Sequence, residues 1–227
     1  MPSNPLPFEP RVLTKSERRR GDLYVFNSPK LGRRVELIEC VRMAVALRFE
    51  FNPLTLAYVE RPRTLDVQGD PVELDFWTRE PRGRERFWLV VAIDDTLSPR
   101  SPRREYRRAR ALMEAAQLAQ LSLEFCYEED LQKDAASLGT WYRLLPYAQT
   151  ALTLPNREAL RTQVMAQFDT LTRASFDQIE SALRGFHAAD VRAITVDLVC
   201  TGQLALVDSA HLTRFSVLER RSAHGQA

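Results

Sequence analysis

The seven-residue apolar run at positions 87–93, Phe-Trp-Leu-Val-Val-Ala-Ile, constrains the fold of this chain more than any other feature. A strand with one face in water alternates apolar and polar residues, whereas a strand buried on both faces is apolar throughout. Seven residues are also far fewer than the roughly 20 that a membrane-spanning helix requires. We therefore expect a central, buried strand in a sheet flanked by helices, which is an α/β arrangement.

The composition is that of a chain able to bury a core, with 44% hydrophobic and 27% charged residues. These fractions exclude wholesale disorder and a miniature scaffold that depends on disulfides. Three widely spaced cysteines, Cys40, Cys126 and Cys200, are interpreted as reduced thiols. The first twenty residues are rich in proline and arginine and lack the apolar centre of a signal peptide. We therefore expect a cytoplasmic protein with no membrane partner.

Short extended segments alternate with helical ones over the first two thirds of the chain. Apolar residues at three- and four-residue spacing predict an amphipathic helix over residues 35–49, which Asn52-Pro53 ends. The expected strands are residues 54–59, 63–67, 72–79, 87–93 and 122–127. The expected helices are residues 103–120 and 141–148. This order predicts a mixed sheet with helices at its flanks.

The last third of the chain changes to three short helices followed by a strand pair. The helices are expected at residues 157–171, 175–185 and 188–201, and the strands at 204–208 and 212–218. Ser175 and Gln178 match the capping-box pattern, and Gly202 follows the end of the third helix. This order is typical of a winged helix. The expected organisation is a flexible basic leader at 1–20, an α/β domain at 21–150, a winged-helix domain at 151–220 and a tail at 221–227.

Several short motifs in the first domain occur in a characteristic order. A segment with an acid near a helix start, Val35-Glu36-Leu37-Ile38-Glu39, leads to Phe51-Asn52-Pro53. An extended segment, Tyr58-Val59-Glu60-Arg61-Pro62, precedes Leu74-Asp75-Phe76-Trp77. These residues, together with the C-terminal helices and strand pair, resemble TnsA, the restriction-endonuclease-fold subunit of heteromeric cut-and-paste transposases. The resemblance covers about residues 21–218 and implies a restriction-endonuclease-like mixed sheet followed by a small winged-helix domain.

The resemblance implies a metal-dependent DNA endonuclease that cuts the 5′ ends of a mobile element. Phosphodiester hydrolysis at neutral pH needs a divalent cation that polarises the phosphate and generates hydroxide from water. Mg²⁺ prefers oxygen ligands in octahedral geometry, so carboxylates from neighbouring elements must converge on it. On the resemblance, Glu39 and Asp75 are the catalytic, metal-binding carboxylates of the helix and of the strand. Glu73, on the same strand face as Asp75, is a further candidate, with a solvated strand end as its alternative role.

The E-x-K motif that the family carries on its next strand has no counterpart here. Counting from Asp75 across the turn at residues 80–83 places it at Val91-Ala92-Ile93. No lysine occurs between Lys30 and Lys133, and arginine stays protonated, so it cannot take a proton from water. Asp94 replaces one acid only if the strand register slips. We expect a catalytically impaired site, with Mg²⁺ as cofactor only if the site is active.

Positive charge is concentrated in the first half of the chain. Residues 1–110 contain 22 basic and 16 acidic residues, whereas residues 150–227 contain eight of each. Arginines suit a phosphate backbone, and their alternative role is a solvated hairpin and helix start. The candidate DNA-binding arginines of this half are Arg79, Arg82, Arg84, Arg86, Arg104 and Arg107, in a cluster that also includes Arg103 and Arg108.

In the winged helix, the third helix is expected to present Arg192 and Thr195 to a major groove, with Arg214 on the wing. The balanced charge of this module is unfavourable for an independent DNA binder. A docking surface for another transposase subunit is therefore the alternative interpretation.

Three functions follow from these observations. The first is a TnsA-like subunit that binds double-stranded DNA at transposon ends, a partner transposase and an ATPase subunit, with a degraded nuclease site. The second is an active metal-dependent endonuclease of the same family or fold, alone or in phage packaging. The third is a non-catalytic DNA-binding or scaffolding protein outside transposition, because a fold alone does not fix a function.

Overall fold

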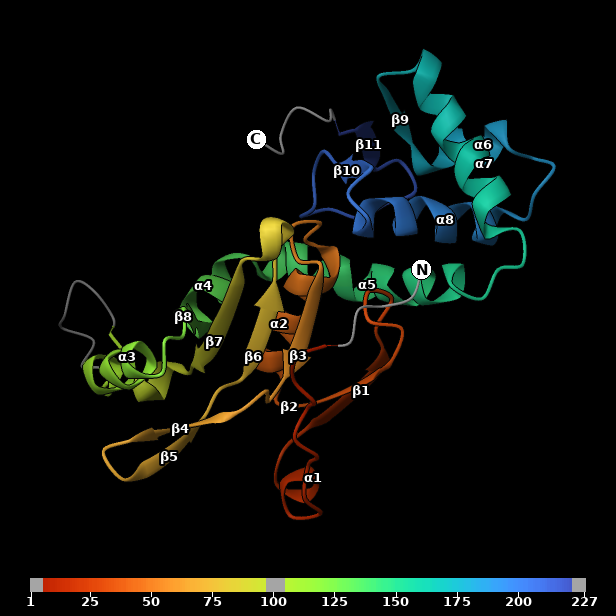
Figure 1. Ribbon diagram of the computed structural model, residues 1–227. Coiled ribbons are helices and arrows are strands. Elements are labelled where there is room, and N and C mark those ends of the chain that lie inside the picture. Colours follow the sequence, from red (N-terminus) through yellow and green to blue (C-terminus); the bar gives the residue numbers. More distant parts are fainter. Residues whose placement is uncertain (1–5, 97–104, 222–227) are drawn as a thin grey trace. The chain divides into compact units, whose positions relative to one another are not determined.

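The computed structural model describes residues 6–96 and 105–221, and the chain divides into two compact units (Figure 1). Unit 1 contains the described residues up to Phe26 together with those of Arg34–Phe49 and Leu54–Lys133. Unit 2 contains Asn27–Arg33, Glu50–Pro53 and the described residues from Asp134 onward. Each unit buries apolar side chains of its own.

Unit 1 is built on a four-stranded mixed sheet in the order β3-β6-β7-β8. The strands are β3 (Ala57–Glu60), β6 (Phe76–Arg79), β7 (Glu85–Val91) and β8 (Leu123–Tyr127). β6 is antiparallel to both β3 and β7, whereas β8 is parallel to β7. A parallel pair requires a crossover connection, which includes α3 (Ala109–Leu118). The predicted α/β class with a mixed sheet flanked by helices is confirmed.

Helices cover both faces of this sheet (Figure 1). α2 (Cys40–Phe51) covers one face, where the ring of Phe49 lies 5.4 to 5.7 Å from those of Tyr58, Phe76 and Trp88. α3 covers the other face, where Leu112 joins a buried apolar cluster from β6, β7 and β8. The central strand β7 therefore lies between two apolar layers, which explains its uninterrupted apolar sequence.

Shorter elements surround the sheet of unit 1. β4 (Thr64–Val67) and β5 (Asp70–Glu73) form an antiparallel hairpin. β1 (Leu23–Asn27) pairs with β2 (Arg34–Ile38). The remaining short elements are the helices α1 (Glu17–Arg20) and α4 (Glu128–Lys133) and the 3-10 turns η1 (Pro81–Gly83) and η2 (Ile93–Asp95). η1 is the predicted turn between β6 and β7.

Two predicted elements are wrong at boundaries that matter for the candidate site. Residues 35–38 belong to β2, so the helix predicted over residues 35–49 begins only at Cys40. Val35 and Leu37 are buried two residues apart, as in a strand. Val35 and Ile38 also fit the three-residue spacing of a helix, which is why the helix was predicted to begin too early. The strand predicted over residues 72–79 is interrupted between β5 and β6, and Asp75 lies in the gap.

The described part of the leader contacts the sheet of unit 1 through residues 8–13, whereas α1 buries no side chain. Phe8 makes edge-on ring contacts with Trp77 and Phe87 at centroid distances of 5.6 and 5.4 Å. Leu13 is buried, and the N–H of Arg11 donates to the carbonyl of Arg61. The apolar residues among the prolines and arginines thus hold the leader against the sheet.

Unit 2 is organised around α8 (Ala188–Cys200), in which residues 193–200 are all buried. The helices α5 (Ala135–Ala151), α6 (Arg157–Thr170) and α7 (Phe176–Ala182) pack against it. A three-stranded antiparallel sheet in the order β10-β11-β9 consists of β9 (Arg173–Ser175), β10 (Leu204–Leu206) and β11 (Val217–Arg220). α5 belongs to unit 2 because it packs on α8, whereas the sequence analysis placed the boundary after residue 150.

Helix ends in unit 2 carry the signals that the sequence predicted. The Ser175 side chain accepts the N–H of Gln178, and the Gln178 side chain accepts the N–H of Ser175, which is the predicted capping box. After α8, the N–H groups of Gly202 and Gln203 donate to carbonyls of the last helical turn, and Gly202 has a φ of 76°. This Schellman motif ends the helix where the glycine predicted its end.

Candidate functional site

Asp75 lies directly before β6, where its carboxylate extends the ladder between β6 and β7. Its N–H donates to the carbonyl of Trp88 at 2.9 Å, and its Oδ2 accepts the N–H of Val90 at 2.6 Å. The side chain is only 7% exposed. A buried carboxylate is tolerated here because both of its oxygens have hydrogen-bond donors, the second of them an arginine.

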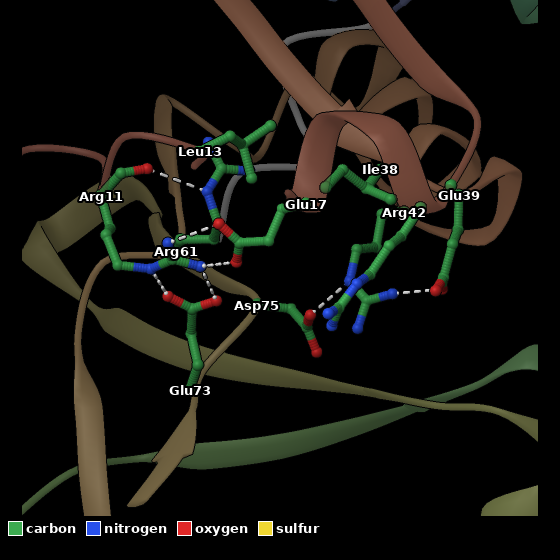
Figure 2. A pocket seen from close by; sticks show the side chains of 11 residues that line it. Arg11, Leu13, Glu17, Ile38, Glu39, Arg42, Arg61, Glu73 and Asp75 are labelled. Carbon is green, nitrogen blue, oxygen red and sulfur yellow. Dashed lines mark hydrogen bonds and ion pairs between the residues drawn. The ribbon is translucent and has the colours of Figure 1, made fainter. Parts of the chain in front are cut away.

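Arg42, in the first turn of α2, is that second donor and links the two acids that the sequence singled out. Its Nε donates to Asp75 Oδ1 at 2.6 Å, and its Nη1 donates to Glu39 Oε2 (Figure 2). Glu39 directly precedes α2 with a φ of 73°, in the left-handed region that non-glycine residues rarely occupy. The structure thus brings Glu39 and Asp75 into one cluster, with a guanidinium between them.

Burial and ion pairing act in opposite directions on this pair. Burial raises the pKa of Asp75, and the guanidinium of Arg42 and the N–H of Val90 offset only part of that rise. Burial lowers the pKa of Arg42, but the carboxylates of Asp75 and Glu39 more than compensate and leave it above its ordinary value. Arg42 is therefore a permanent cation at this position at any working pH.

These residues line a cavity of about 280 Å³ in unit 1 (Figure 2). Four arginines and four acids are among its lining residues, so its charges balance. Arg11, from the leader, donates to both carboxylate oxygens of Glu73 and to both of Glu17. These hydrogen bonds raise the pKa of Arg11 above its ordinary value. The leader therefore forms one wall of the cavity and neutralises Glu73, the further candidate acid.

The residues of the cavity do not fit a magnesium ion. Mg²⁺ requires several oxygen ligands in octahedral geometry, with carboxylates that are free to approach it. Here Asp75 and Glu39 are bound by Arg42, and Glu73 is bound by Arg11. Within residues 6–96 and 105–221, no three histidine, cysteine or acidic side chains are grouped closely enough to hold a metal ion.

The β7 residues bonded to Asp75 are apolar, as are the residues expected at the E-x-K positions. They lie earlier in β7 than the expected positions 91–93. Asp75 is bonded to Trp88 and Val90, whereas β7 ends at Val91 and the expected E-x-K position runs into the turn η2. Asp94, the possible replacement acid, is exposed in η2 and is not among the lining residues of the cavity. β7 therefore contributes backbone and packing to the site but no ionisable side chain near Asp75.

The candidate DNA-binding arginines of unit 1 differ in how far acids neutralise them. Arg79 pairs with Glu85 and stacks on Trp77, and Arg86 contacts both Glu80 and Glu124. Arg84 is 3.8 Å from Glu80 with its side chain 67% exposed.

Two further arginines of unit 1 have no acidic partner among the described residues. Arg82 is exposed in η1 and has no such contact. Arg107 contacts only the carbonyls of Asp94 and Thr96. Arg104 and Arg103 lie outside the described residues. Arg82, Arg84 and Arg107 thus remain the cations most available to a phosphate.

The candidate groove-reading residues of unit 2 are not presented as expected. Thr195 is 1% exposed and its hydroxyl donates to the carbonyl of Val191 in its own helix, so it cannot reach a base. Arg192 is held by both carboxylate oxygens of Glu180, at 2.6 and 3.0 Å. Arg214 is exposed and lies in the loop before β11. The expectation that α8 enters a groove with these residues is corrected, because α8 is the buried centre of unit 2.

Sequence reasoning missed the two arginines that pair with the candidate acids of the unit 1 cavity. Glu39 and Arg42 are three residues apart at a helix start, which is an ion-pair spacing and was a usable signal. Arg11 and Glu73 are 62 residues apart in sequence, so no local pattern could have paired them.

In residues 6–96 and 105–221, no helix combines the length and the apolar composition needed to cross a bilayer. No model of a known protein family matches the sequence, and the search of curated proteins likewise finds no match.

Proposed function

We propose that this chain is a TnsA-like subunit of a heteromeric cut-and-paste transposase, which binds DNA through unit 1 without cutting it. The element order supports this proposal. In unit 1, α2 precedes three antiparallel strands, and α3 then leads to the parallel strand β8. This is a mixed sheet flanked by helices, as the resemblance implies for the restriction-endonuclease-like domain. In unit 2, three helices and the sheet β10-β11-β9 support the winged-helix part.

The observation that carries the non-cutting part is the ion pair between Arg42 and Asp75. The guanidinium is bonded to Asp75 Oδ1 while the N–H of Val90 is bonded to Oδ2, and the same guanidinium holds Glu39 as well. A divalent cation would have to displace a charged, hydrogen-bonded arginine from a buried partner, which is strongly unfavourable. Neither Trp88 nor Val90, the β7 residues bonded to Asp75, could move a proton to or from water.

DNA binding is supported by exposed arginines of unit 1 that acids neutralise weakly, as for Arg84, or not at all among the described residues. Arg82, Arg84 and Arg107 leave positive charge at the η1 turn and before α3. Contacts between arginine and phosphate position a protein on DNA without reading its sequence. A partner transposase would then supply the recognition of the transposon ends.

The test combines DNA binding with a cleavage assay. The purified chain is mixed with transposon-end DNA and the partner transposase, in Mg²⁺ or Mn²⁺, and both binding and strand nicking are measured. We expect a DNA complex with no nicking attributable to this chain, and the same result for Asp75→Asn. Metal-dependent nicking that disappears in Asp75→Asn would show that the chain is an active endonuclease instead. Absence of any DNA complex, with or without the transposase, would overturn the proposal as a whole.

A further inference from the structure

Unit 2 contains a cavity of about 300 Å³, which shares no lining residue with the cavity around Asp75. Its walls come from α5, from the first residue of α7, from α8 and from the loop at residues 212–214. Three arginines line it, Arg143, Arg192 and Arg214, together with the aromatic residues Tyr147 and Phe176. No acidic residue is among its lining residues. We call this cavity the arginine pocket.

Two of the three guanidinium groups in the arginine pocket keep most of their charge uncompensated. Arg192 is neutralised by Glu180 and lies over the rings of Tyr147 and Phe176, at 5.8 and 5.9 Å from their centroids. Among the described residues, Arg143 contacts only a backbone carbonyl, that of Leu212, at 3.4 Å. Arg214 is 3.9 Å from Asp177, in a contact whose two side chains are 66% and 44% exposed, and such exposed pairs are weak.

We propose that the arginine pocket binds an acidic peptide segment of a partner protein, with a carboxylate held by Arg143 and Arg214. An apolar side chain beside that carboxylate packs on the half-buried ring of Tyr147, beneath which Phe176 is buried. Arginine suits this task because its planar group of donors matches a carboxylate in a two-bond geometry. The Tyr147 ring supplies apolar contact area that a free inorganic anion could not use.

The geometry favours a peptide over a DNA duplex. A duplex presents phosphates spread along its backbone and needs a row of cations, whereas these arginines converge on one concave site. The last 78 residues carry eight basic and eight acidic side chains, so this part of the chain has no net attraction for DNA. Beside Arg214, the ring of Phe215 is 58% exposed and stacks under its guanidinium at 4.5 Å. An exposed aromatic residue next to arginine is typical of protein-binding surfaces.

The test measures binding of a defined peptide pool to the full chain by fluorescence polarisation. The pool consists of labelled eight-residue peptides in which Asp or Glu alternates with Phe, Leu or Tyr. A matched pool carries Asn and Gln in place of the acids. We expect the acidic pool to bind and the amide pool not to bind. Arg143→Ala and Arg214→Ala should each weaken binding about tenfold, the effect of losing one hydrogen bond to a charged group.

The control variant is Arg184→Ala, which removes the same charge from an exposed arginine of unit 2 outside the pocket. It should change the affinity less than about twofold, since a screened surface charge contributes little. If Arg184→Ala and Arg143→Ala weakened peptide binding equally, the binding would depend on the overall charge of the chain and not on the pocket. That result would overturn the proposal. Equal binding of the amide pool, no binding of the acidic pool, or complete displacement of the peptides by a 20-base-pair duplex would overturn it too. The inference does not rest on DNA binding by unit 1, because the variants, the ligand and the readout are different.

Discussion

Arg42 sets the electrostatics of the unit 1 cavity because one guanidinium contacts two carboxylates. Asp75 is almost fully buried, so its charge is tolerated only while Arg42 and the N–H of Val90 hold it. Glu39 is exposed over more than half of its side chain and adds less. Removing the arginine would therefore leave a buried carboxylate unpaired, which lowers the free energy of unfolding.

Replacing Arg42 with methionine should lower the free energy of unfolding by about 3 kcal/mol, the cost of leaving a buried charge without its partner. The control Arg110→Met removes an arginine that is 94% exposed and pairs with Glu114, and it should change stability by less than about 0.5 kcal/mol. Urea unfolding followed by circular dichroism measures both. A loss in Arg42→Met no larger than in Arg110→Met would show that Asp75 does not depend on Arg42.

The raised pKa of Asp75 predicts a pH dependence of stability. Between about pH 4, where the unfolded chain releases the proton, and the higher pKa of the folded state, the folded protein holds one more proton. The free energy of unfolding of the natural chain, relative to Asp75→Asn, should therefore fall as pH rises through this window. The fall should be larger in the Arg42→Met background, because the guanidinium no longer lowers the pKa. Parallel stability profiles of the two chains from pH 4 upward would contradict the assignment.

Among the elements, α8 is fixed at both ends and is buried from Ala193 to Cys200. His187 Nδ1 accepts the N–H of Ala189 at its start, and the Schellman motif at Gly202 ends it. Gly202 also lies against Pro53, also in unit 2, and a Cβ built on the glycine would be 2.3 Å from the Pro53 Cβ. The conformation and the space at this position both require glycine.

Gly202→Ala should therefore destabilise unit 2 by more than about 2 kcal/mol, from the positive φ and the steric overlap together. Gly139→Ala is the matched control, because Gly139 lies inside α5 with open space around its missing Cβ. There, alanine should stabilise by up to about 1 kcal/mol through its helix propensity. Thermal unfolding of the two variants measures the contrast, and equal midpoints would exclude the tight contact at Gly202.

At the scale of the whole molecule, charge is distributed differently in the two units. Unit 1 combines balanced ion pairs in its cavity with unneutralised arginines at η1 and before α3. From residue 150 onward, five of the eight arginines form close ion pairs with acids: Arg157, Arg161, Arg173, Arg192 and Arg220. Electrostatic attraction to DNA is therefore expected from unit 1.

The affinity of the full chain for a 30-base-pair duplex should fall as salt rises, since bound phosphates release counterions. The double variant Arg82→Ala/Arg84→Ala should lower the slope of log affinity against log salt by about 2, one for each arginine lost. Arg86→Ala, which removes a guanidinium already held by Glu80 and Glu124, should leave the slope nearly unchanged. Fluorescence anisotropy at several salt concentrations measures these slopes, and a salt-independent affinity would show that the η1 arginines do not contact DNA.

Neighbouring residues are enough to predict the local features of this protein. The apolar strand β7, the turn at η1, the capping box at Ser175 and the helix end at Gly202 all depend on neighbouring residues, so short-range patterns specified them. The charge state of the cavity depends on long-range contacts, because Arg42 bonds to Asp75 across 33 residues and Arg11 bonds to Glu73 across 62. The packing of residues 8–13, the strand at residues 35–38 and the burial of α8 likewise depend on tertiary contacts. Each of these features depends on contacts between residues that are far apart in the sequence. The local spacing of residues does not predict such contacts.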